Sequence, residues 1–417
     1  MNTTLPRTPL FFTSVLTALA LICAAGQAEA AASAANDPSG TWTATGALVG
    51  GGGGYGCAAT NLPDGNVLLV SAFAISEVYE VASGKWTITS PLNEERWGPT
   101  VILLPNGKAL AAGGWNSRHA LLSSAELFDP ASRTWTNTGA MLSVHYKHTA
   151  TLLPNGKVLV TGNNYRTNEA FVTVRVTVAA DGASGRTTRT IDRPTGKGMA
   201  AGDEDRANDF ASAELYDPAT GTWKRTASLK QPRGHHTATL LTNGLVLVVG
   251  GYGKQGTALS SAELYDPTAE TWTEVGGLEL ARGSHTATLL PDGKVLVAGG
   301  EDGSGAYLRE AELFDPVSDT WTAAKPMLWE RSYHTATLLQ NGKVLAAGGF
   351  GPVGSLRFVE VYDPATGAWT RPKPMAVARF WHTATLMPSG KVLIAGGAGA
   401  DLGDPLSSTE LFDPRGR

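Results

Sequence analysis

The 417-residue sequence contains 50 glycines and 23 prolines, which is typical of chains that are either disordered or built from many short strands. Eleven tryptophans, 42% hydrophobic residues and only 17% charged residues argue against disorder and supply material for a large core. The formal net charge of −4 indicates neither a nucleic-acid nor an anionic-membrane partner, and two cysteines exclude a disulfide framework.

Residues 1–30 have the layout of a secretory signal peptide. Arg7 precedes an apolar run from Leu10 to Ala25, and Ala28-Glu29-Ala30 offers a cleavage site. This run is short for a membrane span, and no second apolar run of that length follows. We therefore expect a secreted or periplasmic protein without a membrane span, in which Cys57 is the remaining cysteine.

A repeated segment organises most of the sequence. His-Thr-Ala-Thr recurs at spacings of 48 or 49 residues in its last four copies, and an earlier copy precedes an insertion. The copies begin at His148, His236, His285, His334 and His382. Each is followed by Asn-Gly, Asp-Gly or Ser-Gly between alternating apolar residues. Because Asn and Gly tolerate positive φ angles, we expect tight two-residue type I′ hairpins here.

Three further segments complete each repeat. A second strand ends in a Gly-Gly pair, and a third ends in Asp-Pro, where proline cannot continue a β ladder. A fourth short strand carries one tryptophan in each repeat: Trp42, Trp86, Trp135, Trp223, Trp272, Trp321 and Trp369. Four antiparallel strands in about 49 residues are typical of one blade of a β-propeller.

The Gly-Gly pair, the Tyr/Phe-Asp-Pro segment and the trailing Trp resemble the kelch-repeat family, which includes the propeller domain of galactose oxidase. The resemblance implies an all-β, seven-bladed kelch-type propeller over residues 31–417. The last repeat ends at Asp413-Pro414 without a Trp strand, and residues 39–43 contain an orphan one. We expect this N-terminal strand to pair with the last blade and close the ring, which removes exposed sheet edges.

Blade three carries an insertion at about residues 164–210. Within it, residues 170–178 alternate as a strand does, and Asp203-Glu-Asp205 forms an acidic segment that we expect to be a solvated turn. By its position, the insertion should project as a hairpin and flap from the same side of the ring as the loops that follow the Gly-Gly pairs.

Residues that recur in most repeats are expected to serve the blade. We expect an Arg–Glu pair between neighbouring blades and a structural role for the repeated histidines, because catalytic groups seldom repeat around a ring. The arginines are Arg96, Arg233, Arg282, Arg331 and Arg379. The glutamates are Glu77, Glu126, Glu214, Glu263, Glu312, Glu360 and Glu410.

Positions that vary between repeats point to function. They cluster just before each repeated histidine and in the loops after the Gly-Gly pairs, which should emerge on one face of the ring. Aromatic and basic side chains on variable loops over a rigid scaffold are typical of a binding surface, although some could instead fill the centre of the ring. The candidate binding residues are Trp97, Trp115, His119, Tyr146, His235, Tyr252, Tyr307, Tyr333 and Trp381.

Galactose oxidase and its relatives make an enzyme the alternative. Tyr333-His334 resembles their adjacent copper ligands, and Cys57 lies in the strand where they carry a cysteine crosslinked to tyrosine. However, no tyrosine stands near Gly98, where the resemblance places the crosslinked residue. The remaining histidine ligand of those enzymes comes from a domain after the propeller, where the present sequence ends.

The sequence therefore predicts a monomeric secreted propeller without catalytic residues, metal or other cofactor. We expect it to act as a binding or scaffold module for a protein or for an extracellular or cell-surface glycan. The alternative is a galactose-oxidase-like copper radical oxidase with an altered or incomplete site, in which Tyr333 and His334 would hold copper.

Overall fold

The computed structural model describes residues 40–51, 56–118, 120–163, 171–179, 186–194, 210–399 and 405–416, all within one compact unit spanning 39–417. The expected signal peptide, His119 and Asp203-Glu-Asp205 lie outside the described residues. No helix in the described part of the chain is both long enough and apolar enough to cross a membrane.

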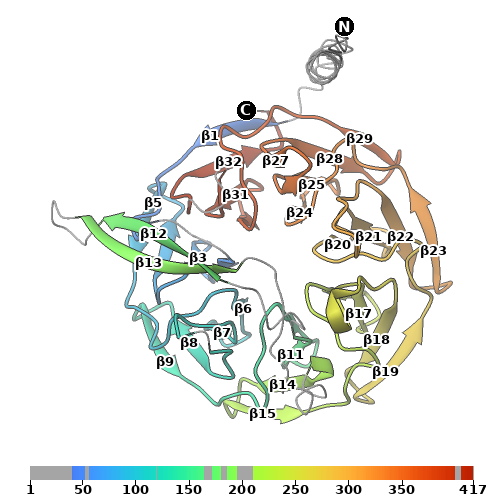
Figure 1. Ribbon diagram of the computed structural model, residues 1–417, viewed down its shortest axis with the longest axis horizontal. Helices are drawn as coiled ribbons and strands as arrows, with labels where there is room; N and C mark the ends of the chain where they lie inside the picture. Colours follow the sequence, from blue (N-terminus) through green and yellow to red (C-terminus); the bar gives the residue numbers. More distant parts are fainter. Residues whose placement is uncertain are drawn as a thin grey trace, which may run out of the picture. The chain divides into compact units, whose positions relative to one another are not determined.

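Seven four-stranded antiparallel sheets form a ring, which confirms the expected seven-bladed all-β propeller (Figure 1). Blade one is β2 (Ala58–Asn61), β3 (Val67–Val70), β4 (Ser76–Glu80) and β5 (Lys85–Ile88). Blade two is β6 (Thr100–Leu103), β7 (Ala109–Ala112), β8 (Ala125–Asp129) and β9 (Thr134–Asn137). Blade three is β10 (Thr149–Leu152), β11 (Val158–Thr161), β14 (Ala213–Asp217) and β15 (Thr222–Arg225).

The remaining four blades repeat this order. Blade four is β16 (Thr237–Leu240), β17 (Val246–Val249), β18 (Ala262–Asp266) and β19 (Thr271–Val275). Blade five is β20 (Thr286–Leu289), β21 (Val295–Ala298), β22 (Ala311–Asp315) and β23 (Thr320–Ala324). Blade six is β24 (Thr335–Leu338), β25 (Val344–Ala347), β28 (Val359–Asp363) and β29 (Ala368–Thr370). Blade seven is β30 (Thr383–Leu386), β31 (Val392–Ala395), β32 (Thr409–Asp413) and β1 (Thr41–Ala44).

Three loops carry short extra elements. The insertion in blade three contains the antiparallel pair β12 (Phe171–Ala179) and β13 (Arg186–Pro194), which confirms the strand expected at 170–178. The loop after β17 contains the 3₁₀ turn η2 (Lys254–Gly256). The loop after β25 contains the pair β26 (Phe350–Gly351) and β27 (Gly354–Ser355).

The N-terminal strand closes the ring as expected. β1 pairs antiparallel with β32, with Trp42 opposite Phe412, and supplies the outer strand that the last repeat lacks. The ring centroids of Trp42 and Phe412 lie 5.0 Å apart, as do those of Phe314 and Trp321 in blade five. The closing blade is therefore packed in the same way as a blade built from continuous sequence.

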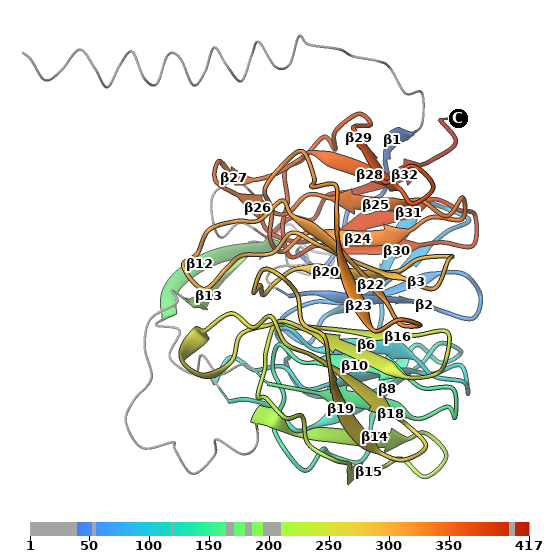
Figure 2. The same cartoon turned by 90° about the vertical axis from the view of Figure 1, so that its right-hand side faces the viewer.

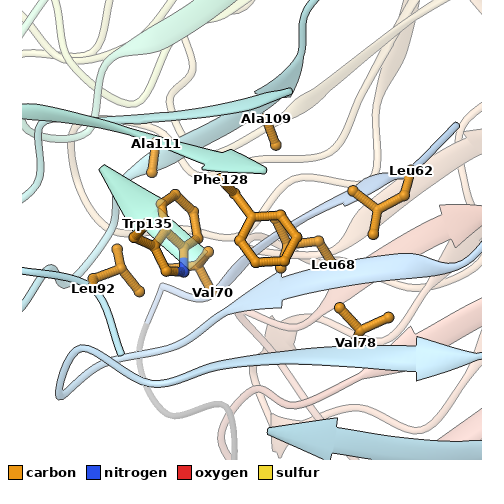
Figure 3. Close-up of a cluster of buried hydrophobic side chains, with 9 residues drawn as sticks. All are labelled: Leu62, Leu68, Val70, Val78, Leu92, Ala109, Ala111, Phe128 and Trp135. Carbon is orange, nitrogen blue, oxygen red and sulfur yellow. The ribbon is translucent and has the colours of Figure 1, made fainter. Parts of the chain in front are cut away.

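The core lies between the blades rather than inside one of them. Figure 3 shows the cluster between blades one and two, where Val70 and Leu68 of β3 meet Phe128 of β8 and Trp135 of β9. Equivalent clusters of buried side chains fill the other inter-blade layers. Because the second strands are buried on both sides, their residues other than Thr161 are continuously apolar instead of alternating.

The turn between the first and second strands differs from the type I′ turn expected from Asn-Gly. In blade two, the Gly107 N–H donates to the Leu104 carbonyl at 2.9 Å, and the Leu104 N–H donates to the Lys108 carbonyl at 2.8 Å. Gly107 has a φ of 83°, whereas Asn106 is not among the residues with positive φ. The loop is therefore a type I turn with three residues, and its glycine lies in a bulge. Pro105 suits the first central position of this turn, but Thr242 and Gln340 stand there in blades four and six, which have the same hydrogen bonds.

The two faces of the ring differ as the sequence predicts. One face carries the turns between first and second strands and the Asp-Pro turns. The other, here called the variable face, carries the crossovers between blades and the loops after the second strands. Isolated bridges join these two kinds of segment, for example Trp97 to Trp115 and Gly234 to Tyr252. Figure 2 shows the ring from its edge, with β26 and β27 on the variable-face side.

Candidate binding site at the centre of the variable face

Seven equivalent residues, one from each crossover, have left-handed backbone conformations around the centre of the ring. Their φ angles lie between 53° at Tyr333 and 70° at Gly56. In five of them, from Gly98 and from His235 to Trp381, the N–H donates to the carbonyl of the equivalent residue in the preceding blade, as in Ser284 to His235 at 3.0 Å and Trp381 to Tyr333 at 3.2 Å. The seven are Gly56, Gly98, Lys147, His235, Ser284, Tyr333 and Trp381.

This backbone conformation favours glycine, which blades one and two have at these positions. In the other five blades a residue with a Cβ adopts it, at a cost of about 1 to 2 kcal/mol each. Three of the five are the bulky residues His235, Tyr333 and Trp381. Glycine would meet the backbone requirement with less strain, so the backbone alone does not account for these side chains.

The side chains from these positions meet one another and their neighbours in a single group, here called the central cluster: Tyr146, Lys147, His235, Tyr252, Tyr333 and Trp381. The Tyr333 and Trp381 rings pack edge to face with centroids 5.1 Å apart. The His235 ring lies 6.0 Å from Tyr333 and 5.7 Å from Tyr252. The Lys147 Nζ lies 5.0 Å from the centroid of Tyr146 and 5.1 Å from that of Trp381.

Five members of the central cluster are residues that the sequence predicts to bind a ligand, and they differ in exposure. Tyr146, His235, Tyr333 and Trp381 are half-buried, so each keeps part of its surface open to a ligand. Tyr252 is only 2% exposed, and its Oη donates a hydrogen bond to Glu301 Oε1 at 2.7 Å. Burial, Tyr333 and Glu301 raise the pKa of Tyr252, which therefore stays a neutral donor.

Trp97 and Trp115 lie beneath the surface, contrary to the expectation that they contact a ligand. They are 5% and 7% exposed, and their centroids lie 4.5 Å apart. The bridge between their backbones brings the crossover and the loop together, so the two rings pack against Ala72 and Tyr146. They hold Tyr146 in place rather than form the surface.

Tyr307 lies farther along the same face. It is half-buried, its ring is 5.9 Å from Phe350, and burial together with Glu301 raises its pKa. The ring centroid of Phe350 lies 5.0 Å from that of Phe380, and the centroid of Phe380 lies 4.8 Å from that of Trp381. Aromatic contacts therefore continue from the central cluster to Tyr307.

The repeated arginines and glutamates form buried ion pairs, but within one blade rather than between neighbouring blades. The arginine precedes the first strand, and the glutamate lies on the third strand of the same blade. Arg282 Nη2 lies 2.7 Å from Glu312 Oε1, and the Arg282 Nη1 donates to the carbonyls of Gly299 and Glu310. Each pair thus fixes the incoming crossover to its blade, which positions the left-handed residue two places later.

Blade three replaces this arginine with His145. Its Nε2 lies 3.2 Å from Glu214 Oε1 and its Nδ1 lies 2.8 Å from the carbonyl oxygen of Gly162, all fully buried. The ring therefore links the incoming crossover to Glu214 on β14 and to the backbone that follows β11. Burial alone would raise the pKa of Glu214, but hydrogen bonds from His145 and from backbone N–H groups bring it below its usual value.

The repeated histidines link neighbouring blades. The Nε2 of His334 shares a hydrogen bond of 3.0 Å with Oγ1 of Thr286 on the first strand of the preceding blade. The same contact joins His285 to Thr237 and His382 to Thr335. Burial lowers the pKa of these histidines, to about 3 for His285 and His382, so they are neutral at ordinary pH. This confirms the structural role expected from their repetition.

Two family models described as Kelch motif match the sequence, one at residues 100–142, 233–279 and 282–328 and the other at 331–376. These matches fall on blades two, four, five and six of the seven four-stranded blades. The protein is a seven-bladed β-propeller with kelch repeats. No curated protein matches the sequence.

Two solved structures resemble this kelch propeller in fold. One is a fungal alcohol oxidase of the AA5 family in complex with copper, with 17% identity and a TM-score of 0.67 over 90% of this chain and 76% of that chain. The other is YjhT, with 14% identity and a TM-score of 0.55 over 79% of this chain and 99% of that chain. At these identities the likeness shows the fold alone.

The residues of this kelch propeller do not fit the copper site of the alternative. The His334 ring is buried against Thr286 and Gly299, whereas Tyr333 contacts His235 and Trp381 in the central cluster. Cys57 donates to the Trp381 carbonyl at 3.5 Å, and burial raises its pKa to about 11, so its thiol is protonated. Among the described residues, no three His, Cys, Asp or Glu side chains are grouped so that they could hold a metal ion.

A polar cleft of about 610 Å³ lies on the variable face of blade two, outside the central cluster. Its lining includes Asn93, Glu94, Asn116 and Arg118, and the Glu94 carboxylate accepts a hydrogen bond from Asn116 Nδ2 at 3.2 Å. None of the predicted binding residues that the structure describes lines this cleft.

Lys147 and His145 are the residues whose roles the sequence analysis missed. Both positions can be found by counting within the repeat, because Lys147 directly precedes a repeated histidine and His145 stands where five other repeats have arginine. The repeat does not predict that the Lys147 side chain contacts Trp381, because Trp381 belongs to blade seven.

Proposed function

We propose that this kelch propeller is a binding module that holds a protein or a glycan ligand at the central cluster. The observation that carries the proposal is the set of bulky side chains at left-handed positions where two blades have glycine. Strained backbone conformations of this kind cluster at functional sites, where the side chain serves function rather than the stability of the fold.

Of the two ligand classes, the central cluster favours a glycan. Half-buried rings of Tyr146, Tyr333 and Trp381 stand beside polar groups of Lys147 and His235. A sugar ring has an apolar face of C–H groups and a rim of hydroxyls, so it can pack on an aromatic ring while its hydroxyls bond to polar neighbours. The Arg–Glu pairs and the ring of backbone hydrogen bonds hold these groups in place before binding.

The test is binding of the purified protein to an array of immobilised polysaccharides and oligosaccharides. The variant Tyr333→Gly/Trp381→Gly places glycine where blades one and two already have it. For any glycan that the wild type binds, we expect this variant to lose at least about tenfold in affinity. The matched control is Val317→Ser, a residue 96% exposed at an Asp-Pro turn on the opposite face, which should bind as the wild type does. Equal binding by both variants would refute the central cluster as the site.

A further inference from the structure

The ammonium group of Lys147 lies between two aromatic rings that come from opposite sides of the centre. Tyr146 is its neighbour in blade three, and Trp381 belongs to blade seven. The side chain reaches Trp381 across blades one and two, whose equivalent residues are Gly56 and Gly98.

The rings that surround this ammonium group are held from behind. A Cβ on Gly98 would lie 2.9 Å from Cε2 of Tyr146, so the ring packs directly on that glycine. Trp381 is flanked by Phe380 at 4.8 Å and by Tyr333 at 5.1 Å. Because these supports do not depend on Lys147, the rings should keep their arrangement when the lysine leaves.

We propose that the central cluster is an aromatic cage for the ammonium group of a ligand, and that Lys147 occupies this cage in the ligand-free protein. The inference rests on the proposed function and specifies its ligand. The face of an aromatic ring attracts a cation within about 6 Å of its centroid, and both distances at Lys147 meet this condition. The ammonium group of a ligand would replace that of Lys147 and make the same contacts with the two rings.

An anionic ligand fits these contacts less well. To pair with an anion outside the cage, Lys147 would have to leave both ring faces, and the anion would not replace the cation contacts that the two rings lose. A cationic ligand instead competes with Lys147 for the same position between the Tyr146 and Trp381 rings. Its apparent affinity in the wild type is reduced by the fraction of time that the lysine fills the cage.

The experiment compares the wild type with Lys147→Ala, which empties the cage, and Lys147→Met, which fills it with an uncharged chain of similar length. The first probe is choline, with its uncharged tert-butyl isostere as the control. The second is a glucosamine hexamer, with the N-acetylglucosamine hexamer as its neutral control, and this arm tests whether the ammonium belongs to a glycan. Binding is measured by calorimetry and by tryptophan fluorescence.

We expect Lys147→Ala to bind choline or the glucosamine hexamer about tenfold more tightly than the wild type does. Lys147→Met should not show this gain, and Lys147→Ala/Trp381→Ala should lose it. The two uncharged controls should not distinguish the proteins. Tightening with choline alone would assign the cage to a small ammonium compound, and tightening with the hexamer would assign it to an amino sugar.

Two results would overturn the inference. One is that Lys147→Ala binds neither cation more tightly than the wild type does while its melting curve shows a folded protein. The other is equal tightening for the charged probe and its uncharged control, which would indicate apolar filling of the space. Glycan binding that depends on Tyr333 and Trp381 but not on Lys147 would leave the proposed function intact and remove only the cage.

Discussion

Glu77 is the third-strand glutamate of blade one, and it differs from its six equivalents in its partners. It is 1% exposed and accepts hydrogen bonds from the backbone N–H groups of Val49 at 2.7 Å and Gly50 at 3.1 Å. Within the described ranges no basic side chain forms an ion pair with it, whereas Glu312 pairs with Arg282. Burial raises the pKa of Glu77 more than the two backbone N–H groups lower it.

The comparison of Glu77→Gln with Glu312→Gln tests this difference. A raised folded-state pKa means that the favourable contribution of Glu77 is complete below the unfolded pKa and is lost as the pH rises through the folded one. We therefore expect Glu77→Gln to raise the melting temperature at pH 7 but not at pH 4. Glu312→Gln should cost about 3 to 5 kcal/mol at pH 7, because it leaves Arg282 buried without its partner. Similar losses in both variants at pH 7 would show that Glu77 has a cationic partner.

Single residues also mark where sequence reasoning reaches its limit. The ion-pair residues and the repeated histidines could be recognised because repetition separates scaffold from variation. Trp97 and Trp381 stand at neighbouring variable positions, yet Trp97 is buried and Trp381 is half-exposed. Depth depends on which loop covers a ring, and for Trp97 that loop is the one carrying Trp115. Nothing in the local sequence specifies that contact.

Among the elements, β1 depends most on a long-range contact. Its assignment could be predicted because a Trp strand was missing at one end of the sequence and left over at the other. The turns show the opposite case. Asn-Gly suggests a type I′ hairpin, yet the loop is a type I turn with a third residue, also where Thr242 or Gln340 stands in place of the proline. Strand pairing follows from the repeat, but the Asn-Gly pair alone does not choose between the two turn types.

Deletion of residues 39–48 tests the closing strand. The deletion exposes the edge of β32 and removes the contact of Trp42 with Phe412, so we expect a lower melting temperature and a tendency to associate. Trp42→Ala keeps the backbone pairing and should cost only the lost packing, about 2 to 4 kcal/mol. Thermal unfolding measures the melting temperature of both variants and of the wild type, and size-exclusion chromatography measures their association. A melting temperature unchanged by the deletion would show that β1 does not stabilise the ring.

At the scale of the whole molecule, the buried histidines predict sensitivity to acid. In the unfolded chain they protonate near pH 6.5, whereas burial keeps them neutral in the folded ring. A base with a lowered folded-state pKa contributes stability that is present above the unfolded pKa and lost as the pH falls towards the folded one. Each such histidine should therefore reduce the free energy of unfolding by about 1.4 kcal/mol per pH unit below about pH 6.

Urea unfolding at pH values from 7 to 4 measures this dependence. The variant His285→Gln/His382→Gln removes two of the groups whose folded pKa is about 3. Its slope of stability against pH should be smaller than that of the wild type by about 3 kcal/mol per pH unit. Parallel slopes for the two proteins would mean that these histidines already carry a proton in the folded ring.

The architecture of the ring could be predicted almost completely because every blade repeats the same sequence pattern. Blade number, strand order, ring closure and the difference between the two faces follow from spacing and from the ends of the sequence. The central cluster could be predicted only as a set of candidate positions. Its contacts join residues from blades three, four, six and seven, and such contacts depend on the curvature of the ring rather than on the repeat.

The free energy of unfolding of Tyr333→Gly/Trp381→Gly tests most directly whether the central cluster serves a ligand or the ring. Replacing each residue by glycine relieves about 1 to 2 kcal/mol of backbone strain, which offsets much of the packing lost from a half-buried ring. We predict a loss below about 2 kcal/mol per site, against about 3 to 5 kcal/mol for the buried Trp97→Ala. A loss at Tyr333 and Trp381 as large as that at Trp97 would contradict this, because it would show that these side chains are core.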